Sequence, residues 1–326
     1  MTRLRMNKRA LRLAGAFLKR RPIWCSWQLT RRCASYCMFC EHRLEGADEE
    51  LDLAGCTRVA EALATGGALL VSLTGGEPFL RSDLAEIVRI VAVHHYPLLT
   101  THGWLVTREK ARTVWAAGLE GATVRLHHAR PDRHDEAAGL PRAHARALEA
   151  VAAFAAERPR GTQRVNVKVR VWSVDDLDGL EALLRTAAEL GASVTVEPGF
   201  PLGGKEGGLS ARLLVLKGQH RNLRSSARYL ARFDEALASG VGGCQAGRAF
   251  VNVDHRGRIS KCVEFQGEGD RVGDLTRESW SQVAPRLRGV SDANACRSCW
   301  YSSRGEIEGL YSARGLVAAL PALVRS

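Results

Sequence analysis

Residues 33–40 read Cys-Ala-Ser-Tyr-Cys-Met-Phe-Cys, which places three cysteines at the spacing C-x3-C-x2-C. The residues just before them, 23–29, are typical of a β-strand, and residues 53–65 have helical spacing. Three thiolates leave one iron of a four-iron cluster open, whereas a closed structural zinc site needs four ligands. The spacing therefore predicts an iron–sulfur cluster that a cofactor or substrate can bind directly.

Short strand patterns alternate with helical patterns from this point to about residue 200. We expect strands at 23–29, 69–73, 97–101, 122–127, 164–171 and 192–197. We expect helices at 53–65, 83–93, 107–117, 141–156 and 175–190. Such alternation indicates βαβ units and a parallel sheet, so the fold class is α/β with a partial (βα)6 TIM-like barrel. The cysteines then lie at the rim where barrel strands end and active sites form.

Three of these strands predict a polar lumen. In residues 164–171 every second residue is valine and the others, including Lys168 and Arg170, are polar. Arg125 and His127 alternate with apolar residues in the same way. Because successive side chains of a strand point to opposite faces, one face packs on helices and the other lines the lumen. A strand buried on both faces would instead be almost continuously apolar.

Composition narrows the class of protein. The chain has 326 residues, 45% of them hydrophobic, and a formal net charge of +12, which favours acidic partners. No apolar run approaches the roughly 18 residues of a membrane span. The basic start lacks a signal-peptide pattern, and the cysteine count of nine is odd, so we expect a reducing cytoplasmic location with cysteines used as metal ligands. Cys25 and Cys56 are expected to be buried apolar residues.

The chain divides by pattern into five parts. They are a basic amphipathic helix (1–22), the core barrel (23–208), a helical linker (209–239), a small α+β cysteine-containing domain (240–312) and a C-terminal helix (313–326). The two terminal helices either pack on the domain edge or make peripheral contact with an anionic membrane.

The cysteine motif resembles that of the radical S-adenosylmethionine (radical SAM) superfamily. Two further segments carry the resemblance: residues 74–78, Thr-Gly-Gly-Glu-Pro, and residues 100–103, Thr-Thr-His-Gly. The resemblance implies that a [4Fe–4S] cluster binds exchangeable SAM and cleaves it to methionine and a 5′-deoxyadenosyl radical, which abstracts hydrogen from a substrate. The cluster ligands would be Cys33, Cys37 and Cys40. By this resemblance the SAM-binding residues would be Gly75, Gly76, Glu77, Pro78 and Thr101. The strand alternation adds Lys168 and Arg170 as candidates, since a cation in the lumen could pair with the SAM carboxylate.

A second cysteine set resembles the twitch domain, a shortened SPASM domain. It consists of Cys244, Cys262, Cys296 and Cys299. The resemblance implies one auxiliary [4Fe–4S] cluster with complete cysteine ligation and a role in electron transfer. A structural zinc site is the alternative, because four cysteines also satisfy tetrahedral zinc.

Strand four departs from the family pattern. Many SPASM and twitch enzymes have Ser or Asp at its end, where this chain has His127 and His128. His127 is a candidate general base and Arg125 a second candidate catalytic residue, while the alternative for His127 is a hydrogen-bonded histidine at the rim. Arg125, together with Lys168 and Arg170, would suit a substrate that carries a carboxylate or phosphate.

We therefore expect a radical SAM oxidoreductase or tailoring enzyme acting on a small polar or anionic metabolite of a specialised pathway. Flavodoxin or ferredoxin is the expected electron donor. One alternative is maturation of a ribosomally made peptide. The argument against it is that only 32 residues precede Cys33, which is too few for a winged-helix recognition domain. A second is radical modification of a membrane lipid. A third, a noncatalytic iron–sulfur or zinc module that binds nucleic acid, leaves the Gly-Gly-Glu-Pro segment and polar lumen unexplained.

Overall fold

The computed structural model describes part of the chain in detail, namely residues 15, 21–37, 40, 49–159, 163–199 and 207–311. The helices predicted at 1–22 and 313–326 lie outside these residues, apart from positions 15, 21 and 22. None of the helices in the described ranges is long and apolar enough to cross a membrane.

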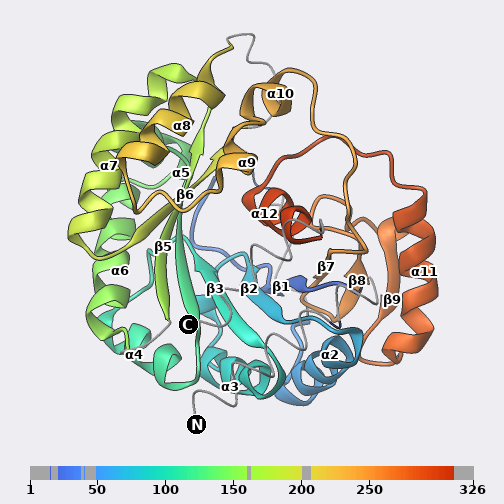
Figure 1. Ribbon diagram of the computed structural model, residues 1–326. Helices are drawn as coiled ribbons and strands as arrows, with labels where there is room; N and C mark the ends of the chain where they lie inside the picture. Colours follow the sequence, from blue (N-terminus) through green and yellow to red (C-terminus); the bar gives the residue numbers. More distant parts are fainter. Residues whose placement is uncertain are drawn as a thin grey trace.

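One mixed sheet organises the molecule, in the strand order β6-β5-β4-β3-β2-β1-β7-β8-β9 (Figure 1). Its strands are β1 (Trp24–Thr30), β2 (Leu70–Gly75), β3 (Tyr96–Thr101), β4 (Gly121–Leu126), β5 (Arg164–Val171), β6 (Ser193–Pro198), β7 (Phe250–Val253), β8 (Arg258–Ser260) and β9 (Arg271–Asp274). Every neighbouring pair from β1 to β6 is parallel. The predicted α/β class and its six parallel barrel strands are confirmed.

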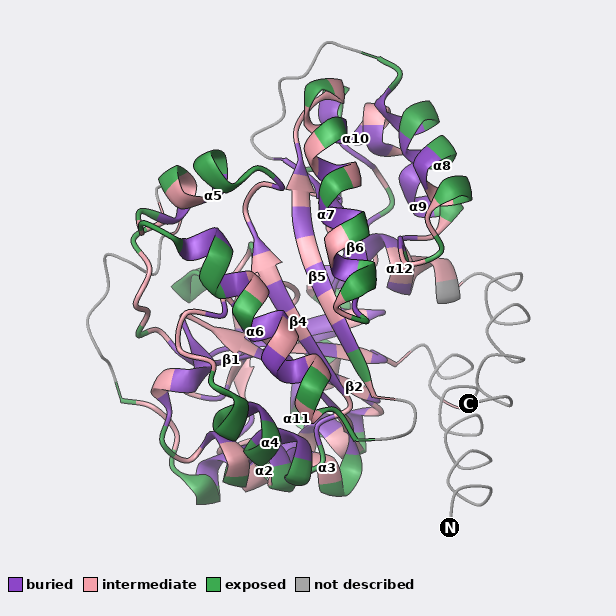
Figure 2. Cartoon of the chain, turned by 90° about the vertical axis from the view of Figure 1, so that its left-hand side faces the viewer, coloured by how far each residue is buried: buried purple, intermediate pink, exposed green. Residues whose placement is uncertain are grey.

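Helices cover the outer face of the parallel strands (Figure 1). The helical elements of this part of the chain are α2 (Leu53–Gly66), η2 (Pro78–Leu80), α3 (Leu84–His94), α4 (Arg108–Ala116), α5 (Pro131–Ala138), α6 (Ala143–Glu157), η3 (Val174–Asp176) and α7 (Leu177–Glu189), where η marks a 3-10 turn. Figure 2 shows buried positions on their inward faces and exposed positions on their outward faces. Burial of these apolar faces against the strands is what holds each helix in place.

The two faces of β5 separate as the alternation predicts. Val165, Val167, Val169 and Val171 are at most 2% exposed and pack in the main core beneath the helices. On the other face, the Asn166 side-chain amide donates to the Thr195 hydroxyl at 3.0 Å. Lys168 and Arg170, further along, line a cavity. The polar lumen is therefore confirmed.

The C-terminal part continues the barrel sheet. It contributes α8 (Leu209–Gln219), α9 (Ala227–Leu230), α10 (Phe233–Ala238), η4 (Glu268–Asp270), α11 (Trp280–Asp292) and α12 (Ser302–Leu310) together with β7 to β9. β7 pairs in parallel with β1, aligning Phe250 with Trp24. The predicted boundary at residue 240 stays a prediction, because the strands beyond it share one sheet with the barrel. This pairing brings the second cysteine set to the barrel mouth.

Candidate functional site

A cavity of about 480 Å³ lies at the carboxyl ends of the parallel strands. Both cysteine sets open into it, together with the polar faces of β4, β5 and β6. The cysteines that line it are Cys33, Cys37, Cys40, Cys244, Cys262, Cys296 and Cys299. The sequence predicted two cysteine sites, and the fold places both on one cavity. Cys25 and Cys56 are at most 1% exposed and lie in the core, as predicted.

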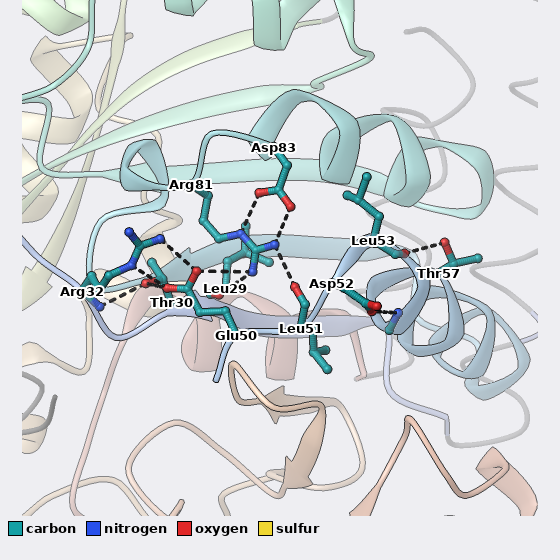
Figure 3. Close-up of polar contacts among 11 residues, drawn as sticks. Leu29, Thr30, Arg32, Glu50, Leu51, Asp52, Leu53, Thr57, Arg81 and Asp83 are labelled. Carbon is teal, nitrogen blue, oxygen red and sulfur yellow. Dashed lines mark hydrogen bonds and ion pairs between the residues drawn. The ribbon is translucent and has the colours of Figure 1, made fainter. Parts of the chain in front are cut away.

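An ion-pair network holds the two ends of the first cysteine loop (Figure 3). Arg32, at the start of the loop, donates to both carboxylate oxygens of Glu50, at its end, over 2.8 and 2.9 Å. Arg81, only 7% exposed, lies between Glu50 and Asp83 and donates to the backbone carbonyl of Leu51 at 2.8 Å. A buried, paired guanidinium is rigid, so the network fixes where the loop leaves and rejoins the barrel.

Gly75, the last residue of β2, and Gly76, which follows it, let the backbone of the cysteine loop approach closely. The backbone N–H of Gly76 donates to the carbonyl of Thr30 at 2.8 Å, and the N–H of Glu77 donates to the carbonyl of Arg32 at 2.8 Å. A Cβ atom on Gly76 would lie 2.1 Å from the Arg32 carbonyl oxygen. Gly75 has a positive φ of 126°, which also favours glycine. The absence of a side chain at both positions thus allows the start of the cysteine loop to pack directly against the end of β2.

We expect Gly76→Ala to displace the first cysteine loop. The added methyl group overlaps backbone, which has no flexible end to move aside. Iron bound by the anaerobically reconstituted protein should fall by about half, if each site holds four irons. Iron and sulfide analysis measures this, and Gly289→Ala is the control, because nothing lies within 4 Å of its Cβ position on α11. Full iron loading of Gly76→Ala would contradict the packing role.

Glu77 is not among the described residues that line the cavity, but it contacts residues that are. Its carboxylate is fully buried and accepts from the Thr101 hydroxyl at 2.7 Å, the His102 backbone at 3.2 Å and the Phe79 backbone at 3.0 Å. Among the described lining residues are Gly75, Gly76 and Thr101, but neither Glu77 nor Pro78. The predicted SAM contacts of this segment remain predictions, and the structure gives Glu77 a further task of orienting Thr101.

Cys33 and Cys37 are protonated thiols unless a metal displaces the proton. Burial is the largest influence on Cys33 and Cys37, and it raises the pKa of Cys37 to about 11. Bound iron would replace those protons, as metal binding does at thiolate sites generally. Three adjacent thiols at the rim, beside the Gly75 and Gly76 backbone, fit a cluster with one open iron.

The second cysteine set is held together by one arginine. Arg304, 1% exposed on α12, donates to the backbone carbonyls of Cys299 at 2.5 Å and Val241 at 2.7 Å, and to the Glu308 carboxylate at 3.1 Å. Glu308 in turn accepts from the Gln245 backbone at 2.7 Å. Arg304 thereby connects the backbone on either side of Cys244 to the backbone at Cys299.

No group of three or more His, Cys, Asp or Glu side chains in the described ranges is arranged to hold a single metal ion. Tetrahedral zinc would need four thiolates around one ion. A four-iron cluster instead binds each thiolate on a separate iron, so its ligands need not converge on one point. The donor set of four cysteines around one cavity fits a cluster with complete cysteine ligation.

Charged side chains on β4, β5 and β6 line the same cavity as the two cysteine sets. Glu197, 2% exposed, forms ion pairs with Lys168 at 3.2 Å and with Arg125 at 3.6 Å. It also accepts from the Ser302 backbone at 3.1 Å and its hydroxyl at 2.8 Å. Burial raises the pKa of Glu197, but Lys168, Arg125 and Ser302 outweigh burial and lower it to about 2. The carboxylate is therefore ionised and joins α12 to the barrel wall.

Replacing Glu197 by glutamine should lower the stability of the cluster-free protein by about 3 kcal/mol at pH 7. The folded-state pKa of about 2 lies below the ordinary value of 4.5. Stability from this group is therefore complete above pH 4.5 and is lost as the pH falls towards 2. Urea unfolding at a series of pH values measures the difference between the two proteins. A difference that stays constant from pH 7 to pH 2 would contradict this account.

The two predicted histidines differ in their surroundings. The Nε2 atom of His127 lies 3.1 Å from the Cys37 Sγ atom, whereas His128 pairs with Asp176 at 2.8 Å. Burial, followed by the charge of Arg125, lowers the pKa of His127 to about 2. Such a ring is a weak proton acceptor at neutral pH. The general-base role of His127 stays a prediction, and the contact with Cys37 offers the ring a different task.

Sequence reasoning missed several cavity residues. The Tyr301 hydroxyl donates to Glu264 at 2.8 Å, and the Lys261 amino group donates to the Asn294 side-chain oxygen at 3.1 Å. Each of the four lines the cavity and lies within two residues of a cysteine of the second set. That proximity was the available signal. Glu197 was visible only as a member of a polar strand face.

Several known proteins are similar to this chain in sequence. The model of the Radical SAM superfamily matches residues 27–184. A PqqA peptide cyclase of Ruegeria pomeroyi is 34% identical over 52% of this chain. The matched region spans 45% of the cyclase, so this chain covers less than half of the length of that relative. The mycofactocin maturase MftC of Mycolicibacterium smegmatis is 26% identical over 85% of this chain and 75% of that protein.

Solved structures share the fold. SuiB of Streptococcus suis bound to S-adenosylmethionine has a TM-score of 0.67 at 16% identity, covering 90% of this chain and 75% of SuiB. SuiB bound to the precursor peptide SuiA has a TM-score of 0.67 at 14% identity, covering 92% and 76%. At these identities the likeness concerns the fold alone.

Proposed function

We propose that this protein is a radical SAM enzyme that modifies a ribosomally made peptide, because residues 27–184 match the model of the Radical SAM superfamily. The observation that carries the proposal is the shared cavity that both cysteine sets line together with Gly75 and Gly76 at the end of β2. The peptide substrate is supported by the names of the similar proteins, a PqqA peptide cyclase and a mycofactocin maturase.

This substrate class differs from the first expectation. The sequence favoured a small polar or anionic metabolite and placed peptide maturation second, on the number of residues before Cys33. The curated relatives favour the peptide instead. A count of residues before a motif is a weak argument, since a peptide can be recognised by another surface or another chain. The cationic cavity wall is compatible with either class.

Two sets of residues would hold the cofactors. Cys33, Cys37 and Cys40 would bind the SAM-dependent [4Fe–4S] cluster, and the second cysteine set the auxiliary one. When bound, these groups supply the 5′-deoxyadenosyl radical that takes hydrogen from the substrate and a one-electron acceptor. The SAM-binding roles of Gly75, Gly76 and Thr101 and of the β5 cations are proposals of the same kind, as is reduction by a flavodoxin or ferredoxin.

The chain's own side chains would orient the substrate. Arg125 presents a buried Nε atom with no hydrogen-bond partner, while its other end lies 3.6 Å from Glu197. A guanidinium with one unused edge is suited to a carboxylate. We propose that it receives an acidic group of the peptide or the carboxylate of SAM.

The substrate class can be tested directly. Reconstituted protein, SAM and dithionite are incubated with peptides encoded by small reading frames beside the gene, and separately with a panel of small carboxylic acids. The proposal predicts 5′-deoxyadenosine formation stimulated by one peptide, with a mass change in that peptide. Stimulation by a small acid that is itself converted, with every peptide inert, would overturn the peptide assignment and leave the radical chemistry intact.

A further inference from the structure

One histidine ring contacts a cysteine of the first set. His127 follows the last residue of β4, and its Nε2 atom lies 3.1 Å from the Cys37 Sγ atom. Both residues line the cavity. The distance is that of a hydrogen bond to sulfur, so the ring nitrogen and the thiol sulfur interact directly.

Two neighbouring histidines hold the ring of His127 in position. The backbone N–H of His127 donates to the Nδ1 atom of His134 at 2.9 Å, and the two rings stack at 5.5 Å with an interplanar angle of 22°. His134 meets His144 edge to face at 5.8 Å, and the Nε2 atom of His144 lies 3.1 Å from the Ala129 carbonyl oxygen. The ring therefore belongs to a packed stack of three histidines, which follow β4, lie on α5 and begin α6.

The direction of the hydrogen bond follows from the chemistry of the cysteine. A sulfur bound to iron carries no proton and acts only as an acceptor. The proton must then reside on the Nε2 atom of His127. Both the neutral ring with its hydrogen on Nε2 and the imidazolium provide that donor, so the bond does not depend on the charge of the ring.

We propose that His127 is a positioning residue that acts through Cys37: its Nε2–H bond to the cluster ligand raises the reduction potential of the SAM-binding cluster. Hydrogen bonds to cluster sulfurs are one of the protein's means of setting that potential. They favour the reduced cluster, which carries one more negative charge. The inference rests on the proposed cluster at Cys33, Cys37 and Cys40.

Three variants separate this role from packing. His127→Leu removes the donor, His127→Gln keeps an N–H at a similar distance, and His128→Gln is the control on the adjacent histidine, which pairs with Asp176. The reduction potential is measured by redox titration, following the electron paramagnetic resonance signal that changes when SAM is added. The potential of His127→Leu should be more negative than that of the wild type, and both glutamine variants should remain near it. An unchanged potential in a fully loaded His127→Leu would overturn the proposal.

A measurement on the unaltered protein covers the case in which His127→Leu binds no cluster. With 15N-labelled histidine, pulsed resonance spectra of the reduced cluster should show a coupling to one histidine nitrogen, and His127→Gln should abolish it. A loaded wild-type protein without such a coupling would refute the hydrogen bond. Failure of the wild type itself to bind iron at the first cysteine set would instead refute the proposed function.

Discussion

Cys33→Ala is expected to abolish formation of 5′-deoxyadenosine from SAM. Two remaining thiolates cannot hold a four-iron cluster with one open iron, so SAM loses its binding site on the metal. Bound iron should fall from about eight to about four per chain, because only the second set keeps complete ligation. The experiment uses anaerobically reconstituted protein with dithionite as reductant and quantifies iron, sulfide and 5′-deoxyadenosine.

Cys56→Ala is the matched control for this change. It also removes one thiol, but from a core position on α2 that is 1% exposed and away from the cavity. Its loss should cost stability without loss of iron or of 5′-deoxyadenosine. Undiminished 5′-deoxyadenosine formation by Cys33→Ala would show that the cluster lies elsewhere.

Arg304→Met is expected to have the second largest effect. The substitution removes the donor that joins the Cys299 and Val241 backbones and leaves Glu308 buried without its cation. Loss of one partner from a buried ion pair costs about 3–5 kcal/mol. Iron should again fall to about four per chain, this time with loss from the second cysteine set.

Two further variants identify the cause. Arg288→Met changes an exposed arginine on α11 and should leave both stability and iron unchanged. The double variant Arg304→Met/Glu308→Gln removes the isolated charge, so it should recover part of the stability without recovering the iron. Urea unfolding and iron analysis of the same preparations give both quantities. Full iron loading of Arg304→Met would refute its organising role.

The barrel was largely predictable from local pattern. The strand expected at residues 164–171 coincides with β5, because alternating valines mark one buried face over its whole length. α5 was missed, since it is short, polar and begins at Pro131. The parallel pairing of β7 with β1 was also missed. That contact joins residues more than 200 positions apart, and no local periodicity encodes it.

The metal-ligating residues of the candidate site could be predicted from the sequence. The residues that hold the walls of the site in place were harder to predict. Cysteine spacing identifies all seven thiols, and strand alternation identifies Arg125, Lys168 and Arg170. Glu197 gains its importance from Ser302, which lies 105 positions later in the chain. Supports of this kind depend on tertiary packing.

The central claim is that the first cysteine set binds a cluster whose open iron takes SAM. The most direct test is the electron paramagnetic resonance spectrum of the dithionite-reduced, iron-loaded protein, recorded with and without SAM. We predict that SAM changes the spectrum of the wild type and of Cys299→Ala, and leaves that of Cys33→Ala unaltered. A fully loaded wild type whose spectrum is the same with and without SAM would contradict the account.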